Sequence, residues 1–225
     1  MSIAENLEKL RDELPAGVEL VLVSKTHPPE AIMEAYDAGQ RVFGENRPQE
    51  MAAKRAVLPD DIRWHMIGHL QTNKVKLIAP FVQLIHSADS ARLLQEIDRQ
   101  AERIGRVIDV LLEIRIAREQ SKEGWVWEEL QEWLGTGEYR GFANVRFRGV
   151  MGVATFTGDM AQVRTEFETL ARMHARLRER FFGPDFDILS MGMTSDWPAA
   201  VECGSTMARI GSLVFGNRSY RKDEE

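Results

Sequence analysis

The chain has 225 residues, of which 44% are hydrophobic and 28% charged, a balance typical of soluble globular proteins. A net charge of −6 argues against broad binding to nucleic acids or anionic membranes, and no apolar run reaches the roughly 18–20 residues that span a bilayer. The single cysteine, Cys203, excludes an internal disulfide and suits a reducing compartment, so we expect a cytoplasmic protein.

The polar, amphipathic start of the chain, residues 1–14, predicts a helix rather than a signal peptide, so export is not expected. Eight β-rich runs follow, and several are continuous aliphatic segments, which is typical of parallel strands covered on both faces. The predicted strands are residues 19–24, 41–43, 63–67, 81–86, 107–114, 148–153, 187–191 and 207–210.

Helical patterns separate these strands. Pro28 and Pro29 open the first and Gly39 closes it, which is the expected asymmetry of proline and glycine in helices. The others are predicted over residues 48–57, 72–78, 89–104, 125–134, 159–182 and 196–203. Asp89, Asp159 and Asp196 are the predicted N-caps, and residues 135–144 are the best candidate for a long loop.

Eight strands that alternate with helices predict an α/β protein, a single (β/α)8 barrel domain spanning residues 1–225. A doubly wound open sheet is the alternative, but its usual G-x-G-x-x-G signature does not follow the first strand. In a barrel, functional groups follow the carboxyl ends of the strands. Lys25 holds that position after the first strand, at the mouth of an apolar run.

The loops after the last two predicted strands have the composition of an anion site. They carry Gly192, Thr194, Ser195, Gly211 and Ser212, small or hydroxyl residues that let an anion approach the backbone. Lys25 would face this site from the neighbouring strand of a closed barrel. Burial favours the neutral amine of a lysine, which is the form that attacks a carbonyl to make a Schiff base.

Five ordered motifs carry a family resemblance: "LVSKTHPPEAI", "VFGENRPQE", "WHMIGHLQTNK", "LSMGMTSDWPAA" and "STMARIGSLVFG". Together they resemble the YggS/PROSC family of pyridoxal phosphate homeostasis proteins. The resemblance implies a barrel of the alanine racemase N-terminal type (fold-type III) that holds pyridoxal 5′-phosphate as an internal aldimine on Lys25. It also implies a role in intracellular vitamin B6 and amino-acid homeostasis.

The resemblance also implies the remaining residues of the site. Asn46 and His65 would lie near the cofactor ring, and Arg209 would meet the pyridine nitrogen. Thr194 and Ser212 would bind the phosphate with their hydroxyls, and Gly211 would do so with its backbone N–H. Independently of the resemblance, Met191 and Met193 alternate with Gly192 and Thr194 along the chain. One methionine is therefore expected to pack in the core and the other to line the ring, and Met191 is taken as the cofactor contact. Glu113 and Arg115 depart from the usual family pattern.

An arginine at the ring nitrogen disfavours its protonation and weakens the ring as an electron sink. Racemases of this fold also use a tyrosine from a separate domain, and none of Tyr36, Tyr139 and Tyr220 is placed to replace it. We therefore expect a monomeric carrier without significant catalysis and without catalytic residues. Apoenzymes that use the cofactor are candidate partners. A weak amino-acid racemase and a cofactor-free Schiff-base aldolase are the alternatives.

His65 and His69 have the i, i+4 spacing of some metal ligands. On a strand that runs into a turn, this spacing does not aim two rings at one ion, and no acidic ligand accompanies them. We expect no metal site.

Overall fold

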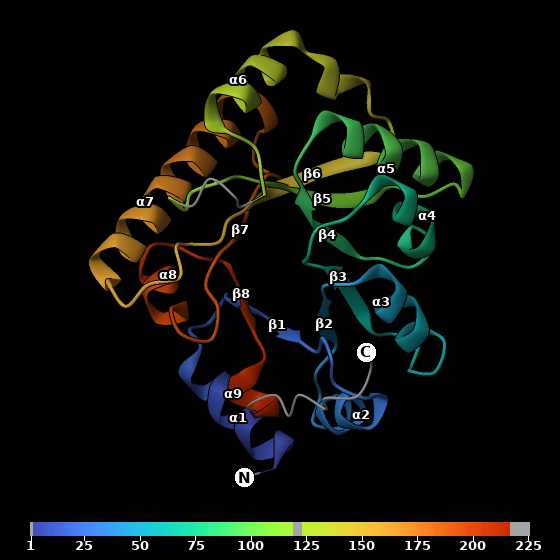
Figure 1. Ribbon diagram of the computed structural model, residues 1–225, viewed down its shortest axis with the longest axis vertical. Helices are drawn as coiled ribbons and strands as arrows, with labels where there is room; N and C mark the ends of the chain where they lie inside the picture. The colour runs from blue at the N-terminus through green and yellow to red at the C-terminus, as the bar shows by residue number, and fades with distance from the viewer. Residues whose placement is uncertain (1, 119–122, 217–225) are drawn as a thin grey trace, which may run out of the picture.

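The computed structural model describes residues 2–118 and 123–216. At its centre, eight parallel strands form a closed barrel in the order β1-β2-β3-β4-β5-β6-β7-β8. Helices surround the strands, as Figure 1 shows, so the barrel prediction is confirmed over the doubly wound sheet. The strands are β1 Glu19–Val23, β2 Val42–Glu45, β3 Arg63–Met66, β4 Leu84–Ala88, β5 Ile108–Glu113, β6 Val145–Met151, β7 Ile188–Ser190 and β8 Met207–Ile210.

The α-helices of the described chain are α1 Ile3–Glu13, α2 Pro29–Asp37, α3 Pro48–Arg55, α4 Val75–Ile78, α5 Ala91–Arg103, α6 Trp127–Thr136, α7 Met160–Leu177, α8 Trp197–Glu202 and α9 Ser212–Phe215. Short 3-10 turns cover Thr72–Lys74 and Glu138–Gly141, and a π turn, Arg178–Phe182, ends α7. The segment 135–144, predicted as a loop, thus contains the end of α6 and a 3-10 turn. The predicted strand 81–86 begins only at Leu84, because Phe81 and Val82 still donate to the carbonyl of Ile78.

Capping residues set several helix starts. Ser2 makes a reciprocal capping box with Glu5 at the start of α1. Asp159 caps α7 as predicted, by accepting from the N–H groups of Ala161 and Gln162. The cap of α5 is Ser90 rather than the predicted Asp89, because the Ser90 hydroxyl accepts from the N–H of Leu93.

Asp196 occupies the N-cap position of α8 as predicted. Its carboxylate, however, turns back to accept from the N–H of Met193 instead of capping the helix. It therefore braces the loop after β7.

Because side chains alternate in direction along each strand, the core has two parts, one inside the barrel and one between the strands and the helices. Inward-facing residues fill the barrel as a small cluster: Val21, Val42, Leu84, Leu111, Met151 and Met207. Their neighbours in sequence, such as Leu20 and Leu22, point outward into the larger cluster between strands and helices. Successive side chains of a strand face opposite sides, so an inward residue near the end of a strand predicts the next inward residue two positions on.

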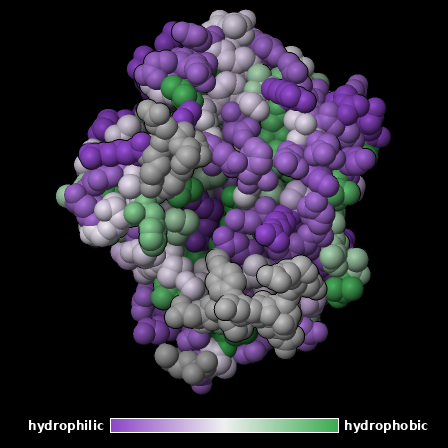
Figure 2. All heavy atoms as spheres, in the orientation of Figure 1, coloured by the Kyte–Doolittle hydropathy of each residue, from purple (hydrophilic) through white to green (hydrophobic). Residues whose placement is uncertain are grey.

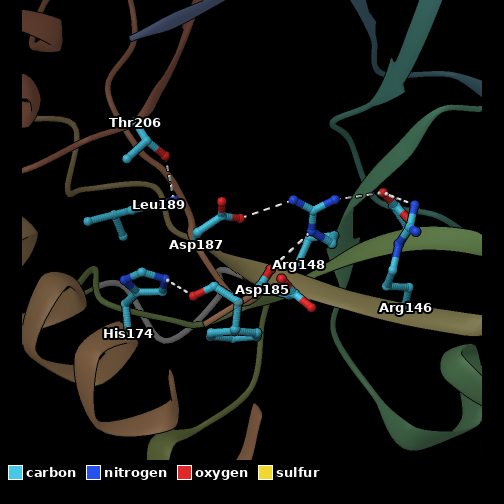
Figure 3. A network of polar contacts seen from close by, with 9 residues as sticks. Arg146, Arg148, His174, Asp185, Asp187, Leu189 and Thr206 are labelled. Carbon is cyan, nitrogen blue, oxygen red and sulfur yellow. Dashed lines mark hydrogen bonds and ion pairs between the residues drawn. The ribbon is translucent and has the colours of Figure 1, made fainter. Parts of the chain in front are cut away.

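The amino ends of β5, β6 and β7 carry a network of ion pairs, drawn in Figure 3. Arg146 binds Asp109 through two parallel hydrogen bonds of 2.6 and 2.9 Å. Arg148 donates to the carboxylate of Asp187 and to the carbonyl of Asp185, both at 3.1 Å. These charged side chains pair with one another at the end of the barrel opposite the carboxyl ends of the strands. We therefore assign them a structural role.

In the described ranges, no helix combines the length and apolar character that a membrane crossing needs.

Candidate functional site

A cavity of about 320 Å³ opens at the carboxyl ends of the strands. Figure 2 shows a hollow near the middle of the face that it presents, with hydrophilic residues along its sides. Six of the eight residues predicted for the site line the cavity: Lys25, Asn46, Thr194, Arg209, Gly211 and Ser212. Val23, His27, Ile67, Val153, Met193, Ser195 and Gly216 complete the lining.

The alternation of side-chain direction along β1 places Lys25 at the cavity. Val21 points into the barrel and Val23 lines the cavity, so Lys25, two residues further, also faces inward. The side chain is half-buried. His27 stacks on Phe215 of α9 with ring centroids 4.4 Å apart, which ties the segment after Lys25 to the last helix.

The loops after β7 and β8 bring two hydroxyls together. The Ser212 hydroxyl donates to the Thr194 hydroxyl oxygen over 3.1 Å. Gly211, between β8 and α9, lies so close to β1 that a Cβ atom there would come within 2.6 Å of the Val23 carbonyl oxygen. The loops after β7 and β8 therefore meet at the cavity that Lys25 also lines, as the sequence predicts. The hydroxyls of Thr194 and Ser212 form a small polar cup there, which we call the hydroxyl cup.

Arg209 is buried, and its guanidinium is held on two sides. One terminal nitrogen donates to the Ser190 hydroxyl at 2.6 Å, and the other donates to the Gly152 carbonyl at 3.0 Å. Burial lowers the pKa of Arg209 to about 10, while Glu113 and Asp196 oppose this shift. The guanidinium therefore stays positively charged at neutral pH and presents a fixed cation to the cavity.

His65 does not line the cavity but lies inside the barrel. Its Nδ1 is 3.1 Å from Nε2 of His86, and Nδ1 of His86 is 3.1 Å from the Ser190 hydroxyl that binds Arg209. Burial lowers the pKa of His65 to about 3 and lowers that of His86 well below its ordinary value. Both rings are therefore neutral at pH 7, and they support Arg209 through Ser190.

Sequence reasoning missed His86 and Ser190. The signal that could have found them is the inward alternation of β4 and β7. Each lies two residues after a residue, Leu84 or Ile188, that belongs to the interior cluster or packs against it.

Met191 and Met193 have exchanged the expected roles. Met193 lines the cavity, whereas Met191 is fully buried in the outer cluster between strands and helices. The reason is again alternation, because Ile188 packs against the interior cluster and Met191, three residues on, faces the other side. Gly192, at φ +94°, then redirects the chain so that Met193 reaches the cavity.

A second cavity, of about 310 Å³, adjoins the first and shares Val153 with it. Glu113 and Arg115, the two departures from the family pattern, both line it. One carboxylate oxygen of Glu113 is buried without a hydrogen-bond partner. Burial, with smaller contributions from Asp89 and Glu123, raises the pKa of Glu113 to about 8. At neutral pH this side chain is therefore a protonated acid.

The spacing of His65 and His69 does not bring their rings to one point. His69 turns toward the carboxylates of Asp89 and Glu123, each 3.2 Å away, while His65 contacts His86. Over residues 2–118 and 123–216, no group of three or more His, Cys, Asp or Glu side chains is arranged so that it could hold a metal ion.

The two tyrosines in residues 2–118 and 123–216 also lie apart from the cavity. Tyr36 donates to Asp61 at the surface, and Tyr139 packs among aromatic side chains such as Phe182. Tyr220 lies outside the described residues.

The family model of the alanine racemase N-terminal domain matches residues 1–219. The chain is 39% identical to the pyridoxal phosphate homeostasis protein of Aquifex aeolicus, over 97% of this chain and 96% of that one. It is 37% identical to the protein of the same name from Vibrio alginolyticus, over 97% and 99% of the two chains.

Among solved structures, PipY of Synechococcus elongatus with PLP bound superposes with a TM-score of 0.88 at 39% identity, over 96% of this chain and all of that chain. Alanine racemase from Streptomyces coelicolor gives a TM-score of 0.75 at 21% identity, over 96% of this chain and 58% of that one. At that identity the racemase shows the likeness of the barrel alone.

Proposed function

The chain belongs to the alanine racemase N-terminal domain family, and we propose that it binds pyridoxal 5′-phosphate through Lys25 and serves pyridoxal phosphate homeostasis. The observation that carries the proposal is one cavity in which a half-buried lysine, a pair of hydroxyls and a buried arginine meet. Relatives that span the same length are named pyridoxal phosphate homeostasis proteins, and PipY was solved with PLP bound.

The residues of the cavity fit this cofactor. Its volume of about 320 Å³ is at the small end of ligand pockets, which span about 300–1,000 Å³. Thr194 and Ser212 offer hydroxyls to a phosphate, and Gly211 keeps the backbone open where a Cβ atom would crowd Val23. Arg209, held by Ser190 and Gly152, would face the pyridine nitrogen, and Asn46 lines the wall.

The cofactor supplies an aldehyde, which condenses with a primary amine to form a carbon–nitrogen double bond with loss of water, a reaction that hydrolysis reverses. Lys25 provides the amine and the hydroxyl cup retains the anion. Arg209 keeps a positive charge at the cavity and does not accept a proton from a ligand. None of the tyrosines in the described part of the chain lines the cavity. The arrangement therefore favours reversible holding over turnover.

We extend the proposal to the chain as a whole. Residues 1–225 act as one domain and as a monomer, because the barrel closes on itself and needs no second chain to complete its fold. A single cysteine suits work in the cytosol. The direct partners are the cofactor and the apoenzymes that receive it.

Borohydride reduction tests the role of Lys25. The protein is loaded with pyridoxal phosphate, reduced and mapped by peptide mass spectrometry. We expect the phosphopyridoxyl group on Lys25, its loss in Lys25→Ala, and its retention in the control Lys76→Ala, which changes an exposed lysine at the surface. Lys25→Ala should keep the fold and some phosphate-anchored binding. A label on another lysine of the parent would refute the assignment.

Turnover is tested separately. The loaded protein is incubated with single enantiomers of small amino acids, and the optical purity is followed by chiral chromatography. Unchanged enantiomers are expected, whereas steady conversion that Lys25→Ala abolishes would establish a racemase instead.

A further inference from the structure

Lys25 lies in a tight turn whose backbone is strained. The turn runs from Ser24 to His27, and the N–H of His27 donates to the Ser24 carbonyl over 3.1 Å. Thr26, at the third position of this turn, has φ +67° and is the only non-glycine residue with positive φ in the described ranges. A turn with positive φ at that position ordinarily places glycine or asparagine there, and a β-branched residue is an outlier. Something outside the turn must hold it.

Two side chains of helix α3 hold the turn on either side of Lys25. Glu50 accepts the N–H of Thr26 at 2.6 Å, and the Lys54 ammonium donates to the Ser24 carbonyl at 2.8 Å. These two residues are one helical turn apart and form an ion pair of 2.7 Å. The residue before Lys25 and the residue after it are thus both bound to the same face of one helix.

The anchor of this pair is buried. The Lys54 side chain is 6% exposed, and it also contacts Glu45, which is fully buried, at 2.7 Å. Glu45 in turn accepts the Ser24 hydroxyl at 2.6 Å. Burial raises the pKa of Glu45, while Lys54 and Ser24 oppose this shift. These contacts of Lys54 and Glu45 are shielded from water, so they fix Ser24, at the start of the turn, to α3.

We infer that Glu50 and Lys54 are positioning residues, which hold the strained Ser24–His27 turn so that Lys25 points into the cavity. The inference rests on the proposed function, because it concerns how the amine of Lys25 meets the aldehyde. Without the acceptor at Glu50, Thr26 is free to return to negative φ, and the direction of the chain at Lys25 changes with it. The hydroxyl cup lies on other strands and is unaffected.

Glu50→Ala is the direct test. It removes the acceptor of the Thr26 N–H, while Lys54 keeps its bond to Glu45. We expect the rate of the covalent link at Lys25 to fall about tenfold, the equivalent of losing one hydrogen bond to a charged acceptor. Total binding of pyridoxal phosphate should change less, because the hydroxyl cup formed by Thr194 and Ser212 is intact.

Two further variants separate positioning from general destabilisation. Asp98→Ala is the matched control, since Asp98 also accepts a backbone N–H, that of Asn144, at 2.7 Å, but before β6 at the opposite end of the barrel. It should leave the rate at Lys25 unchanged. Thr26→Gly, added to Glu50→Ala, should restore most of the rate, because glycine adopts positive φ without an external holder.

A readout without cofactor completes the experiment. In the apoprotein, the amide hydrogen of Thr26 should be protected from exchange in the parent and in Asp98→Ala, but not in Glu50→Ala. Parent-like exchange and a parent-like rate in Glu50→Ala would overturn the inference while the proposed function stands. A parent that forms no borohydride-reducible link on Lys25 would overturn the proposed function, and the inference with it.

Discussion

Replacing the buried acid beside the cavity should change how the stability of the protein depends on pH. Glu113 has a pKa of about 8 in the folded chain against an ordinary value of 4.5, mainly because of burial. Between these values the folded state keeps the proton that the unfolded state releases. The free energy of unfolding therefore falls as pH rises through this window. Glu113→Gln keeps the size and polarity of the side chain but removes the ionisation.

The magnitude follows from the width of the window. Each pH unit contributes about 1.4 kcal/mol, so about 5 kcal/mol is the upper bound between pH 4.5 and 8. Glu123 lines the same second cavity as Glu113, and its side chain is 49% exposed. Water therefore reaches this cavity and lowers the free-energy cost of ionising Glu113 below the upper bound. We expect the free energy of unfolding of Glu113→Gln, measured relative to that of the parent, to rise by at least about 2 kcal/mol as the pH increases from 5 to 9.

Urea unfolding of parent and variant at a series of pH values measures this difference. Glu129→Gln, which changes an exposed carboxylate on α6, is the control and should follow the parent at each pH. If Glu113→Gln and the parent keep a constant difference from pH 5 to pH 9, then Glu113 does not hold a proton at neutral pH. The description of the second cavity would then be wrong.

Four other substitutions have definite expected outcomes. Thr194→Ala and Ser212→Ala should each weaken retention of pyridoxal phosphate by about 1.5–3 kcal/mol, as measured by equilibrium dialysis, and an unweakened double variant would place the anion elsewhere. His65→Gln should reduce the loss of stability on acidification below about pH 6.5, because the folded pKa of about 3 makes the unfolded state the stronger proton binder there. Acid unfolding that is identical in parent and variant would contradict the buried, neutral ring. Gly149→Ala should lower the free energy of unfolding by about 3 kcal/mol or more, because the new Cβ would overlap the carbonyl oxygen of Ile188 on β7. A thermal melt within a degree or two of the parent would show that the strands can separate at this point.

The sequence alone was sufficient for the barrel and for most of the cavity. Aliphatic runs alternating with helical segments predict eight covered parallel strands, and a closed barrel brings their carboxyl ends to one place. Lys25, Thr194 and Ser212 could therefore be assigned to one site before their distances were known. Their positions follow from where each strand ends, which is a local property of the chain.

Tertiary structure decided which face each residue presents and what it meets there. Met191 was expected at the cavity, but the pleat of β7 turns it outward, and only the geometry at Gly192 brings Met193 in. His65 points into the barrel, and its partner His86 comes from another strand.

The contacts of α3 with the turn at Lys25 also depend on tertiary structure. Glu50 and Lys54 read as ordinary surface charges in sequence, since their partners Thr26 and Ser24 lie more than twenty residues away. Such contacts join segments distant in the chain, and no local pattern encodes a hydrogen bond whose two ends are brought together only when the barrel closes.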